Sequence, residues 1–277
     1  MNDTTPKPIL ILGGTGKTGR RLAERLTAQG LPVRIGSRSG TPRFDWEVRA
    51  TWGPAMHGVS AVYISYYPDL AVPGAAEVIG AFARLAVQNG ITRLVLLSGR
   101  GEAEAQRAEE MVKASGADWT ILRCAWFSQN FSEGFLVEPL LEGEVALPVG
   151  NVGEPFVDAD DIADAAFAVL TEPGHVGQLY ALTGPRLLSF ADAVAEIGKA
   201  AGRDIRFVRI SHEEFTAAVG AHELPAEFAW LLNELFTEVL DGRNESLTDG
   251  VQRVLGRQPR DFFAYATATA ATGIWSN

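Results

Sequence analysis

Short apolar runs alternate with helical patterns through the first half of the chain. The run ILIL at residues 9–12 is typical of a strand that is buried on both faces of a parallel sheet. Apolar residues recur at helical spacing between such runs, for example at Val78, Phe82 and Leu85. Further strands are predicted at residues 33–37, 43–46, 61–65, 94–98 and 120–123, with a helix that ends at Gln29 and another from about residue 103 to 115. This alternation predicts an α/β fold with a doubly wound parallel sheet, the Rossmann arrangement.

The pattern changes after about residue 125. Glycine and proline interrupt residues 145–155, and most of the remaining chain has helical periodicity. Ser211 with Glu214 three residues later is a capping-box pattern at the start of a helix. Short strands are predicted at residues 179–182 and 206–210, and aromatic residues cluster at Trp126, Phe127, Phe131 and Phe135. We therefore predict an NAD(P)-binding core at residues 1–125 and a smaller, mostly helical substrate-binding lobe at 126–277, whose strands can rejoin the main sheet.

Composition restricts the class of protein. The 277 residues are 47% apolar and 21% charged, which is typical of a well-cored globular chain. The net charge of −10 argues against nucleic acid as a partner. A single cysteine, Cys124, and a start without a secretory leader pattern predict a cytoplasmic protein. Scattered histidines and the absence of a long apolar run predict no metal site and no membrane span. We expect a monomer or homodimer that acts on a small molecule.

A glycine-rich turn separates the first strand from the first helix. Gly13, Gly16 and Gly19 fall in a GxxGxxG spacing, and Thr15, Lys17 and Thr18 lie between them. Such a turn lets the backbone approach a dinucleotide diphosphate, which then lies on the free N–H groups at the helix start. A glycine turn without a ligand is the plain alternative. A triphosphate loop is disfavoured, because the required glycine is replaced by Ile11 in the buried strand.

The end of the second strand indicates which dinucleotide binds. An acidic residue usually stands there when the cofactor is NAD. Here the sequence has Ser37, Arg38 and Ser39, which offer a guanidinium group and two hydroxyls to a 2′-phosphate. Lys17 can add positive charge from the turn. NADP(H) is therefore the predicted cofactor, with Arg38 as an ordinary solvated residue as the alternative.

Several segments together resemble a known family. They are LGGTGKTG at 12–19, SRS at 37–39, LLS at 96–98, TILR at 120–123, WFSQNF at 126–131 and PFVDADDIA at 155–163. The chain resembles the NmrA-like group of atypical short-chain dehydrogenases/reductases, and within it the ergot alkaloid reductases of the festuclavine synthase and agroclavine dehydrogenase family. The similarity of pattern extends over nearly the whole chain.

The resemblance implies further contacts with the cofactor and the substrate. Asp45 and Trp46 would approach the adenine; Ser65, Tyr66 and Tyr67 would follow the fourth predicted strand; Ser98 and Gly99 would follow the fifth; Trp126, Phe127 and Asn130 would line the substrate side. Tyr66 and Trp126 are the residues that we expect to border the reacting atoms. The plain alternatives are that Trp46 and Phe127 are core residues, that Asn130 caps a helix, and that Tyr66 and Tyr67 pack within a loop.

The helix after the fifth predicted strand lacks the usual catalytic pair. Typical short-chain dehydrogenases carry a tyrosine and a lysine four residues apart on this helix, whereas residues 100–112 contain neither. Reduction of a simple ketone needs such a proton donor, whereas an iminium, a quinone or an activated C=C needs less help. Tyr66 or Tyr67 could donate a proton from another wall. Glu109 and Glu110 on this helix are expected to form a solvated face, and a role near the cofactor is the alternative.

These patterns predict an NADPH-dependent reductase of a small, planar, electron-poor substrate, in which positioning rather than acid catalysis governs hydride transfer. A non-catalytic redox sensor that binds NADP(H) is the alternative, because the missing pair fits it equally well. ATP-dependent phosphoryl transfer is a third and weaker hypothesis.

Overall fold

The computed structural model describes residues 6–221 and 225–276. The chain forms two compact units. Unit 1 comprises Met1–Arg123, Ile162–Tyr180 and Arg253–Gly256, and unit 2 comprises Cys124–Asp161, Ala181–Gln252 and Arg257–Asn277. The interpretation of the N-terminal start partly concerns residues 1–5, which lie outside the described residues.

A six-stranded sheet carries the α/β part of the fold. Its strands are β1 (Ile9–Leu12), β2 (Val33–Gly36), β3 (Ala61–Ile64), β4 (Arg93–Gly99), β5 (Asp118–Cys124) and β7 (Gln178–Leu182), in the spatial order β2-β1-β3-β4-β5-β7. The register is parallel, with Ile9 opposite both Val33 and Ala61. The order reverses at β1, which is the place where open α/β sheets bind ligands outside the carboxyl ends of their strands.

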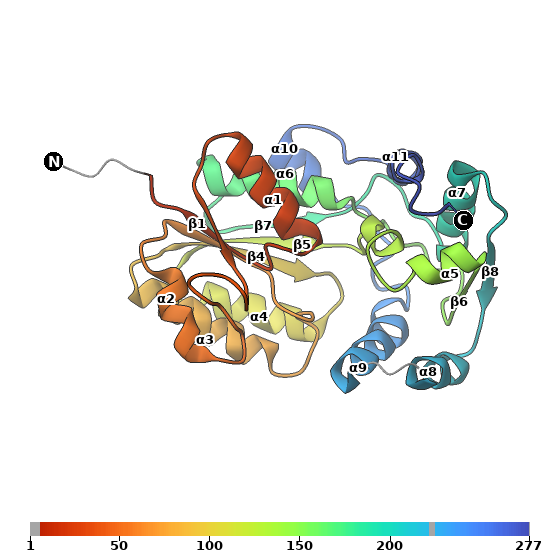
Figure 1. Ribbon diagram of the computed structural model, residues 1–277, viewed down its shortest axis with the longest axis horizontal. Coiled ribbons are helices and arrows are strands. Elements are labelled where there is room, and N and C mark those ends of the chain that lie inside the picture. The colour runs from red at the N-terminus through yellow and green to blue at the C-terminus, as the bar shows by residue number, and fades with distance from the viewer. Residues whose placement is uncertain (1–5, 222–224, 277) are drawn as a thin grey trace. The chain divides into compact units, whose positions relative to one another are not determined.

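Helices cover both faces of this sheet, which confirms the doubly wound arrangement. The helices are α1 (Lys17–Ala28), α2 (Trp52–Met56), α3 (Ala75–Gln88), α4 (Ala103–Lys113) and α6 (Ala159–Thr171), with a short 3-10 turn, η1 (Arg49–Thr51). Figure 1 shows α1 and α6 on one face and α2, α3 and α4 on the other. The buried face of α3 includes Ile79, Phe82 and Ala83, spaced as one helical stripe.

One predicted strand is wrong. Residues 43–46 form a loop, in which the Phe44 backbone N–H donates to the Ser37 carbonyl at 2.9 Å. The apolar residues of this segment serve an aromatic cluster instead of a ladder, because Phe44 and Trp46 contact Phe82 with ring centroids 5.9 and 5.2 Å apart. The loop is further held by Trp52, whose indole N–H donates to the Asp45 carbonyl at 2.9 Å.

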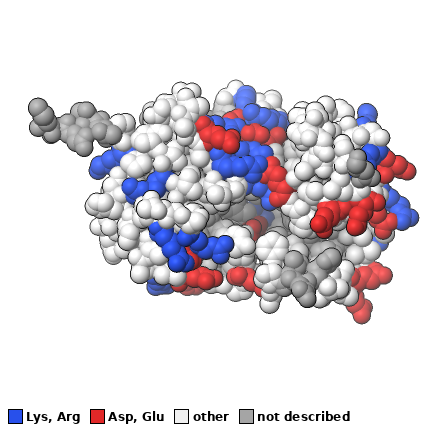
Figure 2. Space-filling model, viewed as in Figure 1, with Lys and Arg blue, Asp and Glu red and all other residues white. Residues whose placement is uncertain are grey.

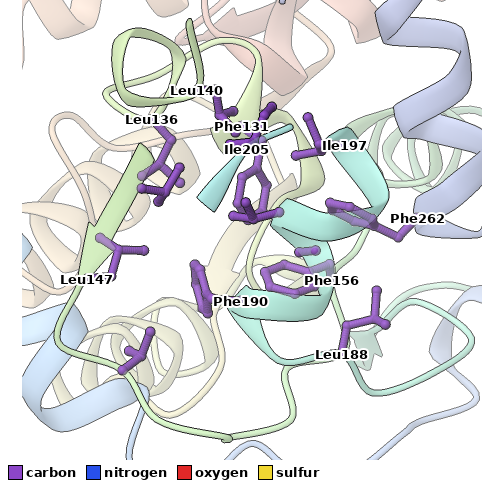
Figure 3. Packing of buried hydrophobic residues seen from close by; sticks show 14 of the residues in the cluster. Phe131, Leu136, Leu140, Leu147, Phe156, Leu188, Phe190, Ile197, Ile205 and Phe262 are labelled. Atoms are coloured by element: carbon purple, nitrogen blue, oxygen red, sulfur yellow. The ribbon is translucent and has the colours of Figure 1, made fainter. Parts of the chain in front are cut away.

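Unit 2 is mostly helical, as the sequence predicts for the C-terminal region. Its helices are η2 (Ser128–Phe131), α5 (Val137–Glu142), α7 (Phe190–Ala201), α8 (His212–Ala221), α9 (Ala226–Glu234), the π-helical turn η3 (Leu235–Val239) and α11 (Phe262–Ala270); α10 (Gly250–Leu255) crosses the boundary. The capping box at Ser211 is confirmed, since the Glu214 N–H donates to the Ser211 hydroxyl at 3.1 Å. Phenylalanines dominate the core: Phe131, Phe156, Phe190 and Phe262 pack edge to face or tilted in Figure 3.

The interruption predicted at residues 145–155 hides a strand at its start. β6 (Glu144–Leu147) pairs in parallel with β8 (Arg206–Arg209) to make a second, two-stranded sheet. The sequence did not indicate β6, because its four residues lie between a glycine turn and a proline-containing segment.

Charged side chains on the surface of unit 1 are extensively paired. Arg107 on α4 bonds Glu77 on α3 and Glu104 on its own helix, and Glu104 also accepts from the Gly74 N–H at 3.1 Å at the start of α3. Figure 2 shows basic and acidic side chains close together on the face in view. Among the described residues, no helix is long and apolar enough to cross a membrane.

Candidate functional site

The glycine turn between β1 and α1 presents a close-packed backbone. Gly13 has φ of +65°, a conformation that favours glycine, and its carbonyl accepts from the Gly16 N–H at 2.9 Å. A Cβ on Gly19 would lie 2.3 Å from the Gly13 oxygen, so only glycine lets α1 start against the turn. The N-cap position of α1 is Gly16, which has no side chain to cap the helix. The helix therefore offers its first N–H groups to an anion, as a dinucleotide diphosphate site requires.

The polar residues of the turn differ in their environments. Thr15 and Gly16 are exposed and Lys17 is half-buried. Thr18 is buried, and its hydroxyl accepts a hydrogen bond from the Tyr63 hydroxyl of β3 at 2.9 Å. Its side chain thus ties α1 to the sheet, and its backbone N–H remains the atom suited to a diphosphate.

Two arginine side chains lie at the end of β2 and on the loop that follows it. Ser37 is half-buried, and Arg38 and Ser39 are exposed; the two serine hydroxyls lie 3.5 Å apart. The loop that follows brings Arg43 to the Asp45 carboxylate at 2.6 Å. The hydrogen bond from Arg43 lowers the pKa of Asp45, and the Arg38 charge acts in the same direction. The sequence assigns Arg43 no role, because its pattern predicts a strand at this position.

An aromatic cluster flanks this region of unit 1. The Trp46 ring lies 5.1 Å from the Tyr66 ring and 4.9 Å from the Phe44 ring. Trp46 is half-buried, so one part of the ring packs in this cluster and the other part is accessible. Tyr67 is 68% exposed. Ser65 lies beside the glycine turn, because a Cβ on Gly13 would meet the Ser65 side chain at 3.1 Å. The structure therefore brings these residues to the carboxyl end of β3, beside the turn.

Two carboxyl groups meet at the carboxyl ends of β3 and β4. Asp69 follows β3, and Glu102 immediately precedes α4. The Glu102 carboxyl group lies against Gly99, because a Cβ added to Gly99 would lie 2.0 Å from a Glu102 carboxyl oxygen. The two side chains are hydrogen-bonded to each other. Burial, followed by the Asp69 charge, raises the pKa of Glu102, and burial also raises the pKa of Asp69 despite the nearby Lys17. The pair is suited to share one proton. The sequence reasoning did not find it.

The expectation for the two glutamates of α4 is half wrong. Glu110 is solvated and pairs with Lys113 at 2.7 Å. Glu109 is fully buried and accepts hydrogen bonds from the Ser98 hydroxyl at 2.7 Å and from the Arg123 Nε at 2.8 Å. The sequence carried a sign of this burial, because the apolar face of α4, formed by Ala105, Ala108 and Val112, passes through position 109.

The three residues predicted on the substrate side belong to unit 2. The Trp126 backbone is held by the Glu154 carboxylate at 3.1 Å, and its ring contacts Phe190 and Phe236 at 5.6 and 5.3 Å. Its indole N–H is buried and has no hydrogen-bond partner among the described residues. Phe127 forms a bridge with Val157, and Asn130 lies half-exposed in η2. These three residues thus lie near one another in the chain and share the start of unit 2, whereas the predicted cofactor residues share unit 1.

Comparison with known proteins identifies the family of the chain. Residues 13–173 match the family model described as NAD(P)H-binding. The chain is 33% identical to an uncharacterized oxidoreductase, YesF, of Bacillus subtilis, over 97% of this chain and 98% of that protein. It is 31% identical to agroclavine dehydrogenase of Claviceps fusiformis (92% and 94% covered) and 30% identical to an NAD(P)H azoreductase of Xenophilus azovorans (95% and 98%).

Solved structures agree on the fold. A quinone oxidoreductase of Escherichia coli in complex with NADPH has a TM-score of 0.75 at 22% identity, covering 94% of this chain and 99% of that one. The negative transcriptional regulator NmrA in complex with NADP has a TM-score of 0.73 at 17% identity, with 97% and 96% covered. These similarities support the arrangement of parallel strands and helices in unit 1.

Proposed function

Because the chain belongs to the NAD(P)H-binding family and is similar over nearly its whole length to oxidoreductases, we propose that it is an NADPH-dependent reductase of a small, planar, electron-poor acceptor. The observation that carries this proposal is the glycine N-cap of α1 behind a turn that only glycine can form. Such a start fits a dinucleotide diphosphate. The residues proposed to hold the diphosphate are Gly13, Thr15, Gly16, Lys17, Thr18 and Gly19, through backbone N–H groups and the Lys17 charge.

Two arginines support a preference for NADPH over NADH. Arg38 is exposed at the end of β2, and Arg43 lies on the loop that bonds back to this strand end. A guanidinium group binds phosphate through two parallel hydrogen bonds. With Ser37 and Ser39, Arg38 is proposed to bind the 2′-phosphate, while Asp45 holds Arg43 in place. We expect Arg38→Ala to weaken NADPH about 10-fold or more and to leave NADH binding unchanged, because a charge-assisted hydrogen bond contributes about 1.5–3 kcal/mol.

The rest of the proposed cofactor contacts follow from the strand order. We propose that the adenine lies near Asp45 and Trp46, which follow β2. The remainder of the cofactor is proposed to lie near the residues that end β3 and β4 or follow them, namely Ser65, Tyr66, Tyr67, Ser98 and Gly99. When bound, NADPH supplies the hydride. The chain's own contribution is to orient the cofactor and the acceptor and to keep water away, which alone can account for a large rate effect.

The residues of α4 and the names of the relatives both bear on the class of acceptor. α4 contains no tyrosine, and its one lysine, Lys113, is at its last position, where it pairs with Glu110. An acceptor whose reduced form needs no strong proton donor therefore suits this chain: an iminium, a quinone or an activated C=C. The relatives include an agroclavine dehydrogenase and an NAD(P)H azoreductase, and the azo group in the name of the second is an electron-poor acceptor other than a ketone.

Aromatic residues are proposed to bind the acceptor. Trp126 and Phe127 offer flat apolar surface, Asn130 can add a hydrogen bond, and the orphan N–H of Trp126 is available to an acceptor atom. In unit 1, Tyr66 is the proposed neighbour of the reacting atoms.

The experiment is turnover of NADPH with a panel of acceptors: a quinone, an iminium dye, an azo dye, an enone and a simple ketone. We expect turnover with at least one of the first four and a kcat/KM for the ketone lower by at least about 100-fold. The measurement is the loss of NADPH absorbance, with product identified by mass. Turnover of the ketone alone would overturn the acceptor class, and NADPH binding without any turnover would favour the second candidate.

The second candidate is a non-catalytic sensor of NADP(H). It is favoured by one observation, the use of the α4 helix for a buried Glu109–Arg123 ion pair instead of a catalytic pair. It predicts tight binding of NADPH or NADP⁺, no hydride transfer to any acceptor, and capture of a protein partner in only one cofactor state.

A further inference from the structure

A buried hydrogen-bond chain ends at the carboxyl edge of the main sheet. Ser98, 4% exposed near the end of β4, donates its hydroxyl hydrogen to the Glu109 carboxylate of α4 at 2.7 Å. Arg123 of β5 donates to the same oxygen through Nε at 2.8 Å and pairs with the second oxygen through its terminal nitrogen. Glu109 is 0% exposed, so this contact is shielded from water. All three residues belong to unit 1.

This chain fixes the direction of the serine hydroxyl. A hydroxyl has one hydrogen and two lone pairs, and an ionised carboxylate can only accept. Arg123 donates to both carboxylate oxygens of Glu109, so each oxygen acts as an acceptor. The single hydrogen of Ser98 is therefore directed at Glu109, and Ser98 presents only lone pairs to any other partner. A ligand group that bonds Ser98 must be a donor.

The strand order indicates which part of the cofactor faces Ser98. The proposed 2′-phosphate site lies at the end of β2, and the diphosphate site follows β1. The next strands in space are β3 and β4. An extended dinucleotide that begins over β2 and crosses the turn thus places its nicotinamide half over β3 and β4. The donors of that half are the ribose hydroxyls and the carboxamide N–H₂.

We propose, on the basis of the NADPH site proposed above, that Glu109 is a positioning residue that holds Ser98 as a hydrogen-bond acceptor for a donor group on the nicotinamide half of the cofactor. Ser98 makes the contact and Glu109 acts through it. The same arrangement withholds the Ser98 hydrogen from the oxygen of a bound acceptor, so Ser98 does not assist reduction of a ketone. Glu109 thereby contributes both to cofactor orientation and to the choice of acceptor.

The test measures dissociation constants of NADPH and of its analogue with an acetyl group in place of the carboxamide, by fluorescence titration. The variants are Ser98→Ala, the pair-removed variant Glu109→Met with Arg123→Met, and the two changes combined. Removing both charges together avoids leaving one charge buried and unpaired. Glu110→Gln is the matched control, because Glu110 is the neighbouring glutamate, its side chain is 72% exposed, and it lies outside the chain of hydrogen bonds.

We expect Ser98→Ala to weaken NADPH about five-fold, the pair-removed variant to weaken it about three-fold, and the combined variant to bind no worse than Ser98→Ala. This non-additivity separates positioning through Ser98 from a merely structural role. If the donor is the carboxamide, the acetyl analogue binds the native protein about five-fold more weakly than NADPH does. The Ser98→Ala variant then binds the acetyl analogue as tightly as the native protein binds it. If the donor is a ribose hydroxyl, Ser98→Ala weakens both cofactors alike.

Two results would overturn the inference: a Ser98→Ala protein that binds both cofactors within two-fold of the native protein, or a combined variant whose loss is the product of the separate losses. If the pair-removed variant does not fold, Glu109→Gln, which keeps the shape of the side chain, replaces it in the same comparison. Failure of the native protein to bind NADPH at all would instead refute the proposed function.

Discussion

The replacement of Gly19 by alanine tests the glycine turn most sharply. The new Cβ would lie 2.3 Å from the Gly13 oxygen and 2.9 Å from the Gly14 Cα. A relaxed carbon–oxygen contact is about 3.3 Å, so α1 must withdraw from the turn by about 1 Å. Overpacking of this kind costs about 1–3 kcal/mol, which lowers the melting temperature of a chain of this size by about 5 °C. A helix start displaced by that distance loses about two charge-assisted hydrogen bonds to the diphosphate, about 3 kcal/mol or 100-fold in Kd.

The assay is calorimetric titration with NADPH together with thermal unfolding. Gly53→Ala is the matched control, because Gly53 lies in α2 and its Cβ would have no neighbour within 4 Å. That variant is expected to keep its affinity and to gain slightly in stability, since alanine restricts the unfolded chain. If Gly19→Ala binds NADPH as tightly as the native protein, the close approach of α1 to the turn is not what holds the cofactor.

Three further predictions address buried polar groups. Burial, and then the Asp69 charge, raise the pKa of Glu102, so the folded protein keeps this proton to higher pH than the unfolded chain does. The stability linked to this proton is lost as pH rises above the ordinary glutamate value of about 4.3 towards the folded pKa. Glu102→Gln should therefore gain stability relative to the native protein in thermal melts as pH rises from about 5 to 8, and a constant difference would contradict this. Trp126→Phe removes a buried donor that has no partner among the described residues, so unfolding should change by less than about 1 kcal/mol while KM for the acceptor rises; a loss above about 3 kcal/mol would mean that the ring is purely structural. Asp161 is fully buried and pairs with two arginines, so Asp161→Asn should cost about 2 kcal/mol in urea unfolding, and a change under about 0.5 kcal/mol would refute the importance of that cluster.

The sequence predicted well those elements whose pattern is local. β1 is four buried residues in a row, α1 follows a glycine turn, and α3 carries its apolar residues on one stripe. In each case the residues that make the pattern are neighbours along the chain. The α/β class, the helical C-terminal region and the family followed from such patterns.

The failures depend on contacts between distant residues. The sequence of residues 43–46 is typical of a strand, but the Trp46 ring packs against the rings of Trp52 and Phe82 and the segment forms a loop. The pattern of α4 predicts a solvated Glu109, but Arg123 of strand β5 forms an ion pair with it inside the fold. The Asp69–Glu102 pair joins two loops that are adjacent only because β3 and β4 are paired. Charge and aromatic character alone did not reveal these partners.

The contacts of the candidate site stay predictions at the level of single residues. Gly13, Gly16 and Gly19 have the conformations and close approaches that the cofactor turn needs. Arg38 has the exposure that a phosphate ligand needs, and Arg43 is an addition from the structure.

The most direct measurement is a side-by-side titration of the native protein with NADPH and NADH. We predict uptake of one equivalent of NADPH, at least about 10-fold tighter than NADH, because the proposed role of the guanidinium group at the end of β2 is to bind the additional phosphate. Equal affinities would refute only the proposed role of Arg38. Uptake of neither dinucleotide would contradict the proposed cofactor site and the reductase function together.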